Sequence, residues 1–440
     1  MSMIIGRTNT RKVSFSPDHS RTPWLPAILM LFYGFNSAVG TNLSIGWYYI
    51  HPAISYIDFV LALNFLFLLD FKTKNVVISM SKVEKIQAFL ILIFSSLLII
   101  STSINSFRFE TSLADILPAI RFIYFIMIIH VIRKYTERFG VSFLINGFII
   151  GVLSLFLQGF VESHSKTSGL PILWNPNVIG AIIGLGIFFC STSLIFGKNL
   201  SFPLFASFIL CAASLLTWSK GTWIMSGLGL VLVIISSFHP WFQKKGNIRK
   251  KNFTIVFIAI LLFTTIYFFM INYGTIKAII DAKLSSTKNI GSVDMRFNLI
   301  LASIQAGIQN PIFGLGFRNF YQAQNCSTGL NSILMDPSWN AHNAFFQILA
   351  TGGIFAFFTL ITIFLFPFMV LRRIYLRQIG GGIWVNLILF LSFGVWFIYG
   401  SVQLQLIAQP PFWFFCGIVF GIYRTSNYLS GKQETIMSPM

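Results

Sequence analysis

The sequence predicts an all-α polytopic membrane protein with about 12 transmembrane helices and one large loop on the outer side. Of its 440 residues, 55% are hydrophobic and only 10% are charged, whereas soluble domains carry roughly 25% charged residues. The mean hydropathy is +0.77. This composition excludes a soluble protein. The net charge is +19. In a soluble chain this charge would suggest a nucleic-acid partner, whereas in a membrane protein it can reflect basic residues in the cytoplasmic loops.

Apolar runs separated by charged or Gly/Pro-rich residues predict the membrane spans. Helices one to nine are expected within residues 24–272 and helices ten to twelve within 343–424. Tails at 1–23 and 425–440 flank them, and the loop 273–342 divides them. The expected spans are 24–40, 53–71, 86–104, 115–132, 141–160, 177–196, 201–217, 221–238, 253–272, 343–370, 383–404 and 411–424.

The basic residues lie mostly on alternate connections between these spans. The basic residues within 244–251 and 372–377 are two examples. The positive-inside rule assigns such connections to the cytoplasm. We therefore expect a multi-pass protein of the bacterial inner membrane with both termini cytoplasmic. Membrane lipids are its surroundings, and the net charge needs no nucleic acid to explain it.

The loop 273–342 lies on the periplasmic side in this topology. It has roughly 70 residues, and loops of that length are usually functional. Apolar residues at helical spacing predict an amphipathic helix from Arg296 to Gln309, with Ser292 or Asp294 as its N-cap and Asn310-Pro311 as its end. Residues 276–284 predict a short helix on the membrane surface.

Four basic residues lie against the positive-inside trend, at or near the outer membrane surface. They are Lys220 in a short hairpin, Arg121 inside a span, Arg296 at the start of the amphipathic helix and Arg318 after a Gly-Leu-Gly turn. A cation at such a position is costly unless it is paired or binds a ligand. The four side chains are therefore candidates to converge on an anion at the outer surface.

Each of these cations also has a structural explanation. Arg121 can pair with Asp115 or Asp58, which lie near the same membrane face. Lys220 can extend its amine to the lipid headgroups. Arg318 can be a solvated loop residue. Arg296 can be one too, although a cation at a helix N-terminus is locally disfavoured by the helix dipole, which favours a role in ligand binding.

His342 is the candidate catalytic base. It follows the large loop and precedes an apolar helix, and an imidazole with an ordinary pKa near 6.5 suits proton transfer near neutral pH. A lone interfacial histidine is also commonly structural. Asp336, six residues upstream, is a possible orienting acid. The six histidines and four cysteines show no metal-ligand spacing, and phosphate-loop and dinucleotide motifs are missing from the sequence, so no metal or cofactor is expected.

Four motifs together resemble the O-antigen ligase and O-antigen polymerase superfamily, which includes bacterial O-oligosaccharyltransferases. The resemblance is strongest within about 215–360. In order, the motifs are Trp218-Ser219-Lys220-Gly221-Thr222-Trp223, then Met295-Arg296-Phe297, then Asn310-Pro311-Ile312-Phe313-Gly314-Leu315-Gly316-Phe317-Arg318-Asn319-Phe320, and then His342-Asn343 with Gly352-Gly353-Ile354.

The resemblance implies a GT-C-like, metal-independent membrane glycosyltransferase that uses a glycan linked to undecaprenyl diphosphate. It transfers this glycan, an O-antigen-like polysaccharide, to an acceptor such as lipid A-core at the periplasmic face. Arg296 matches the family's loop arginine and His342 its essential histidine. Lys220 stands where the family usually has arginine, and Thr351 stands where an acidic residue is frequent. Lys cannot clamp a diphosphate bidentately as Arg does.

Two other functions stay open at the level of sequence. A polymerase of O-antigen or exopolysaccharide repeat units is the alternative within the superfamily, and such polymerases commonly have two sizeable outer loops where this chain has one. A transporter or flippase of lipid-linked sugars also suits about 12 spans. A transporter should hold its ionisable groups near mid-membrane, whereas most of the candidates here lie near the outer boundary.

Overall fold

The structure is a computed structural model, and it is helical apart from one pair of very short strands. It describes residues 49–51, 54–55, 80–109, 116–165, 176–196, 201–216, 220–243, 274, 287–317, 319–326, 341, 343–377 and 410–437. The helices are α3 (Lys82–Phe109), α4 (Leu117–Phe139), α5 (Val141–Ser165), α6 (Pro176–Phe196), α7 (Ser201–Leu216), α8 (Lys220–Gln243), α11 (Thr287–Gln309), the 3-10 helix η2 (Phe320–Cys326), α12 (Ala344–Arg377) and α14 (Pro410–Met437). The strands β1 (Tyr49–His51) and β2 (Ile54–Ser55) pair antiparallel.

Eight of the spans expected from hydropathy coincide with described helices, namely α3 to α8, α12 and α14. The expected spans 24–40, 253–272 and 383–404 and the expected surface helix 276–284 lie outside the described residues. Of the expected span 53–71 the structure describes only β2, which is a strand. The helical class is therefore confirmed, whereas the number of transmembrane helices stays a prediction.

Two described helices are long and apolar enough to cross a membrane. They are Lys82–Ser106 of α3 and Ala344–Ile374 of α12. Both carry large hydrophobic side chains on an outward face, with Phe89 62% exposed on α3 and Phe358 58% exposed on α12. Such a surface is costly in water and favourable in lipid. These helices support the membrane assignment by length, composition and exposure.

Local signals explain where α3 begins and where α4 ends. Ser81 and Glu84 form a capping box at the start of α3: the Ser81 N–H donates to Glu84 Oε2 at 2.6 Å, and the Glu84 N–H donates to Ser81 Oγ at 3.3 Å. α4 ends at Gly140, whose φ is 83° and whose N–H donates to the Thr136 carbonyl at 3.0 Å. α5 follows at the next residue.

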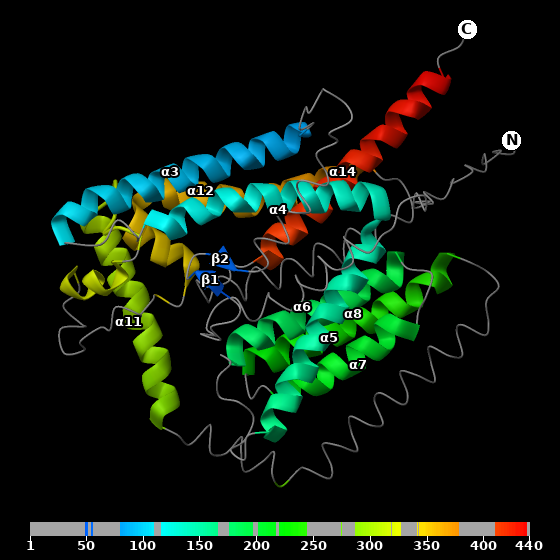
Figure 1. The fold of residues 1–440 in the computed structure, drawn as a ribbon, viewed down its shortest axis with the longest axis horizontal. Helices are drawn as coiled ribbons and strands as arrows, with labels where there is room; N and C mark the ends of the chain where they lie inside the picture. The colour runs from blue at the N-terminus through cyan, green and yellow to red at the C-terminus, as the bar shows by residue number, and fades with distance from the viewer. Residues whose placement is uncertain are drawn as a thin grey trace, which may run out of the picture.

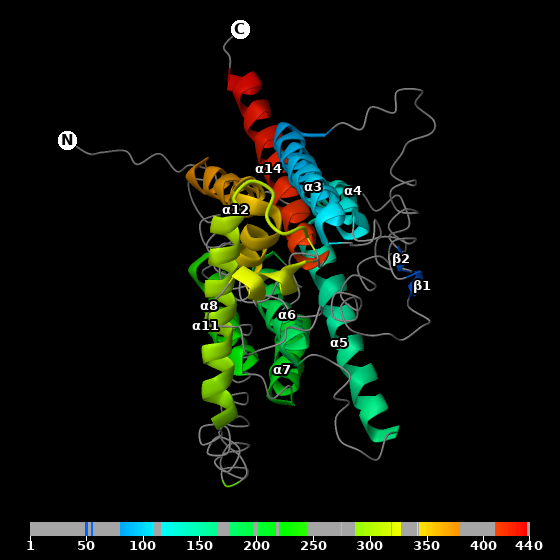
Figure 2. The same ribbon diagram turned by 90° about the vertical axis from the view of Figure 1, so that its left-hand side faces the viewer.

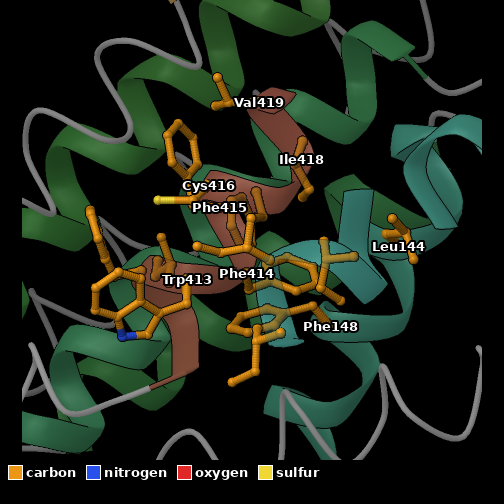
Figure 3. Packing of buried hydrophobic residues seen from close by; sticks show 14 of the residues in the cluster. Leu144, Phe148, Trp413, Phe414, Phe415, Cys416, Ile418 and Val419 are labelled. Atoms are coloured by element: carbon orange, nitrogen blue, oxygen red, sulfur yellow. The ribbon is translucent and has the colours of Figure 1, made fainter. Parts of the chain in front are cut away.

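The aromatic start of α14 joins the helices into one hydrophobic core (Figure 3). The Trp413 ring stacks on Phe125 of α4 with centroids 4.6 Å apart, and Phe412 stacks on Phe364 of α12 at 4.2 Å. Phe414 reaches the other group of helices and stacks on Phe148 of α5 at 5.2 Å. α14 thus packs between α4 and α12 on one side and α5 and α6 on the other.

Two glycines bring α14 very close to α4. A Cβ at Gly417 would lie 2.6 Å from the Ile132 Cβ, and one at Gly421 would lie 2.5 Å from the Thr136 Cβ. The four-residue spacing places both glycines on one face of α14, an arrangement that brings membrane helices into backbone contact. No larger residue fits at either position without moving the helices apart.

Ion pairs join the first turn of α3, the second half of α4 and the middle of α14. Glu84 Oε1 lies 2.6 Å from Arg133 Nε and 3.2 Å from His130 Nδ1. Glu137 Oε1 lies 2.5 Å from Arg133 Nη1 and 3.6 Å from Arg424 Nε. Glu84 and Arg133 are 1% and 0% exposed. Charges buried this deeply are tolerated because each faces an opposite charge.

Candidate functional site

α11 places Arg296 at an exposed position well inside the helix. The sequence predicted that Arg296 opens the helix behind an N-cap at Ser292 or Asp294, but α11 begins at Thr287. That expectation is wrong: Ser292 and Asp294 lie within the helix, and Arg296 follows them in its third turn. The cost of a cation at a helix N-terminus does not apply to it. The predicted end of the helix at Gln309, before Asn310-Pro311, is confirmed.

The turn after α11 inserts into a break in α12. Gly353 has φ of 77°, which interrupts the regular helix. The Ile354 N–H donates to the Pro311 carbonyl at 2.8 Å, and the N–H groups of Leu315 and Gly316 donate to the Ala350 and Thr351 carbonyls at 2.9 Å each. The break frees helix carbonyls, and the turn supplies their donors.

Glycine is required on both sides of this junction. A Cβ at Gly353 would lie 2.3 Å from the Ile312 carbonyl oxygen, and one at Gly314 would lie 2.5 Å from the Thr351 carbonyl carbon. Both glycines have positive φ, 77° and 61°, which non-glycine residues rarely adopt. The Gly-Leu-Gly turn and the Gly-Gly-Ile motif, about 40 residues apart in sequence, are thus two halves of one backbone contact.

Three buried polar side chains of α3 fasten the turn from the other side, and the sequence reasoning did not find them. Ser101 Oγ donates to the Thr351 carbonyl at 2.8 Å and to the Phe313 carbonyl. Asn105 Nδ2 lies 3.2 Å from the Gly314 carbonyl, and Thr102 Oγ1 accepts the Phe317 N–H at 3.2 Å. Their spacing could have indicated these contacts, because polar residues at positions i, i+1 and i+4 of an apolar span need polar partners.

Arg318 and His342 lie outside the described residues, but the residues on both sides of each are described. Before Arg318, the Phe317 N–H is bonded to Thr102. After it, the Asn319 N–H donates to the Gly316 carbonyl at 3.0 Å and Asn319 Nδ2 donates to the Leu315 carbonyl at 3.0 Å. The chain enters and leaves Arg318 through fixed backbone.

The segment around His342 is held by the first turns of α12. The Ala341 N–H donates to Gln347 Oε1 at 2.6 Å, and Asn343 Oδ1 accepts the N–H groups of Phe345 and Phe346 at 3.0 and 3.2 Å. Asn343 is therefore the N-cap of α12. This cap fixes the residue that follows His342.

One small hydrophobic cluster brings three site segments together. It contains Leu299 of α11, Leu315 of the turn, Phe320 of η2, Ala341 beside His342 and Ala350 of α12. Leu299 is one turn after Arg296, and Phe320 is two residues after Arg318. The helix of Arg296, the turn before Arg318 and the segment beside His342 thus pack on one another.

The remaining predicted site residues are placed less fully. Arg121 lies in the second turn of α4, and Lys220 is the first residue of α8; their side chains lie outside the described part, as does Asp336. The expectation that Lys220 and Arg121 converge with Arg296 stays a prediction. Among the described residues, no group of three or more His, Cys, Asp or Glu could hold a metal ion.

The comparison with protein families agrees with the motifs. A family model described as O-antigen ligase matches residues 205–361, a segment that runs from α7 into α12. It includes Lys220, Arg296, Arg318, Asp336 and His342 and leaves out Arg121. The resemblance predicted from the four motifs is thereby confirmed. No curated protein matches the chain.

Proposed function

We propose that this chain, which carries an O-antigen ligase domain at residues 205–361, transfers a glycan from undecaprenyl diphosphate to lipid A-core at the periplasmic face of the inner membrane. The family indicates a ligase-type glycosyltransferase or a polymerase, with a lipid-linked glycan and a glycan acceptor as its partners. The donor carrier, the acceptor and the compartment are the proposed part.

The packed junction lies within the segment that matches the family model, and this position supports the proposal. The junction of α11, the Gly-Leu-Gly turn and the start of α12 lies inside residues 205–361. Arg296 lies one turn before Leu299 of that junction, and Arg318 and His342 each adjoin residues that it fixes. A rigid backbone next to cations and an imidazole is the kind of support that a transfer site needs.

In this mechanism the acceptor hydroxyl attacks the anomeric carbon of the donor sugar. The new glycosidic bond forms as the bond between that carbon and the diphosphate oxygen breaks, and undecaprenyl diphosphate leaves. His342 takes the proton of the acceptor hydroxyl, a general-base contribution of about 10²–10⁴ in rate. Asp336 would orient the imidazole.

Fixed cations would stabilise the charge that develops on the leaving diphosphate. Lys220 and Arg296 are the principal candidates, with Arg121 and Arg318 as further ones. Losing one such group typically lowers the rate by about 10²–10³. Because these side chains neutralise the leaving group, the proposed reaction needs no divalent ion. Addition of EDTA should leave the transfer rate unchanged, and inhibition that one divalent ion reverses would contradict this part.

A deletion strain tests the proposed function. If the chain is a ligase, the strain should accumulate long polymer on undecaprenyl diphosphate and make lipid A-core without polymer. Single repeat units on lipid A-core would instead identify a polymerase, the alternative that the single large outer loop of the sequence disfavours. Transport of the lipid-linked sugar by purified protein, without glycan transfer, would identify a transporter.

A further inference from the structure

The apolar stripe of α11 faces away from the protein. Phe297, Leu301, Ile304 and Ile308 follow one another at intervals of four, three and four residues, which places them along one side of the helix. Phe297 and Ile308 are 60% and 72% exposed. The stripe that made this helix look amphipathic in sequence is therefore not the face that packs on the protein.

The packed face of α11 is made largely of small residues. It consists of Leu299, Ala302, Ser303, Ala306 and Gly307, all of which are buried. Their positions lie roughly opposite the outward stripe at 100° per residue. The polar residues Asn298, Gln305 and Gln309 follow a third side of the helix. α11 thus has one face for the protein, one apolar outward face and a polar edge.

The direction of α11 differs from that of α3 and α12, the two described helices that are long and apolar enough to cross a membrane. α3, α4 and α12 run side by side across the upper part of Figure 1, whereas α11 runs down the page, and in Figure 2 it again runs down the page. A helix that runs roughly perpendicular to two helices that cross the membrane runs parallel to the membrane plane. The C-terminal end of α11 leads directly to the α12 break.

The part of α12 after the break is long enough to cross a membrane by itself. Of the candidate span Ala344–Ile374, the residues from Ile354 onward number about 21, or about 31 Å at 1.5 Å per residue, close to the roughly 30 Å of a hydrocarbon core. The exposed basic residues Arg372 and Arg373 lie at its far end. α11 therefore meets α12 at the end opposite to the basic residues.

The outward faces of α11 and α12 form a continuous surface. Between them lie Ile312 and Phe313, which are 53% and 39% exposed, and on α12 the surface continues at Ile354 and Phe355, which are 40% and 56% exposed. The Ile354 N–H donates to the Pro311 carbonyl at 2.8 Å, so the two parts touch. Because the outward stripe of α11 continues the outward side of α12, we expect both to face lipid.

We propose that α11 and the Ile312-Phe313 turn are an interfacial membrane anchor, whose outward stripe lies against the lipid chains of one leaflet. α11 lies in the membrane plane with the stripe towards lipid, and at 100° per residue the polar edge and Arg296 flank the stripe on opposite sides. Arg296, beside Phe297, then lies at the level of the lipid headgroups, where the diphosphate of a lipid-linked donor lies. That last consequence rests on the proposed function, whereas the anchoring does not.

Site-specific quenching in a bilayer tests the anchor. A fluorescent amino acid is introduced into the full chain by stop-codon suppression at position 308, at position 309 as the matched control, or at position 358 as the lipid-facing reference. Gln309 follows Ile308 directly and is turned about 100° around the helix. Each variant is reconstituted in phosphatidylcholine vesicles whose acyl chains are brominated close to the glycerol, and separately exposed to aqueous iodide.

The anchor predicts that bromine quenches position 308 to an extent similar to position 358 and several-fold more than position 309, with iodide showing the opposite order. Iodide quenching at 308 without bromine quenching would mean that α11 lies in water and would overturn the proposal. Shielding of 308 from both quenchers would mean that protein covers the stripe, which would overturn it as well. Leu301 provides a second stripe position if the variant at 308 does not fold. Quenching does not depend on glycan transfer, so this experiment decides the anchor independently of the proposed function.

Discussion

The hydroxyl of Ser101 on α3 lies 2.8 Å from the carbonyl oxygen of Thr351 on α12, at the break in that helix. The same hydroxyl also reaches the Phe313 carbonyl in the turn after α11. One serine side chain therefore joins three segments that are far apart in sequence. Because a serine hydroxyl has a single hydrogen, the two carbonyls share it. This contact is the centre of the backbone junction that supports the proposed site.

Thr102 gives the most selective test of that junction. Thr102→Val keeps the shape of the side chain but leaves the Phe317 N–H without its acceptor, at a cost of about 1–3 kcal/mol to the turn. We expect faster hydrogen exchange at residues 313–317 and a lower rate of glycan transfer, with both restored by Thr102→Ser.

The matched control is Thr136→Val on α4. Thr136 is equally buried and, like Thr102, donates to a carbonyl four residues earlier at 2.8 Å. Among the described residues 310–317 and 319, none forms a hydrogen bond with Thr136. Equal effects of the two valine variants on exchange at 313–317 would show that the Thr102 contact does not hold the turn.

Gly353→Ala should destabilise the protein because a Cβ there would lie 2.3 Å from the Ile312 carbonyl oxygen. Positive φ at a non-glycine residue adds about 1–3 kcal/mol. We expect a clearly lower thermal midpoint in detergent. Gly227→Ala on α8 is the control, because a Cβ there meets no atom within 4 Å and alanine favours a helix by roughly 0.5–1 kcal/mol. A similar loss in both variants would contradict the junction geometry.

Glu84→Gln should be destabilising. It removes one of the two carboxylates that face the fully buried Arg133, at 2.6 Å, while Glu137 stays 2.5 Å from Arg133 Nη1. We therefore expect a loss below the about 3–5 kcal/mol of a fully uncompensated buried charge. Chemical unfolding measures the loss. The double variant Glu84→Gln with Arg133→Gln should lose less than the sum of the two single variants. Strict additivity would show that the two side chains do not stabilise one another.

Lys220 tests the charge requirement of the proposed donor site. Lys220→Ala should lower the transfer rate by about 10²–10³ if the ammonium stabilises the leaving diphosphate. Lys220→Arg should keep or raise the rate, because a guanidinium can bind phosphate oxygens in pairs. Initial rates with a defined lipid-linked donor distinguish these results. A collapse in Lys220→Arg would mean that the local geometry is built around an ammonium.

Hydropathy predicted the helices well because apolar runs and polar interruptions are local features. The bounds of α6 and α7 agree with the predicted ones to within one residue. The start of α11 was predicted wrongly. A cap residue contributes only about 1 kcal/mol, and Ser or Asp inside a helix costs less than that, so Ser292 and Asp294 did not stop the helix from beginning at Thr287.

Long-range contacts could not be predicted from the sequence. Residues 343–370 read as one uninterrupted span, but the turn from residues 310–317 inserts at Gly353 and breaks the helix. The motif glycines were recognised by resemblance, whereas their physical role depends on a partner segment about 40 residues away. Ser101 was missed because its acceptors lie more than 200 positions along the chain.

In the proposed reaction a glycan leaves a lipid diphosphate at this site and His342 acts as the base. The most direct test is transfer by purified His342→Ala in vesicles that contain a labelled lipid-linked oligosaccharide and lipid A-core. Ser106→Ala is the control, because the Ser106 hydroxyl donates to the Ser103 carbonyl, a local contact within α3. We expect no product from His342→Ala at a wild-type level of folded protein, and a wild-type rate from Ser106→Ala. A wild-type rate from folded His342→Ala would mean that His342 is not the base.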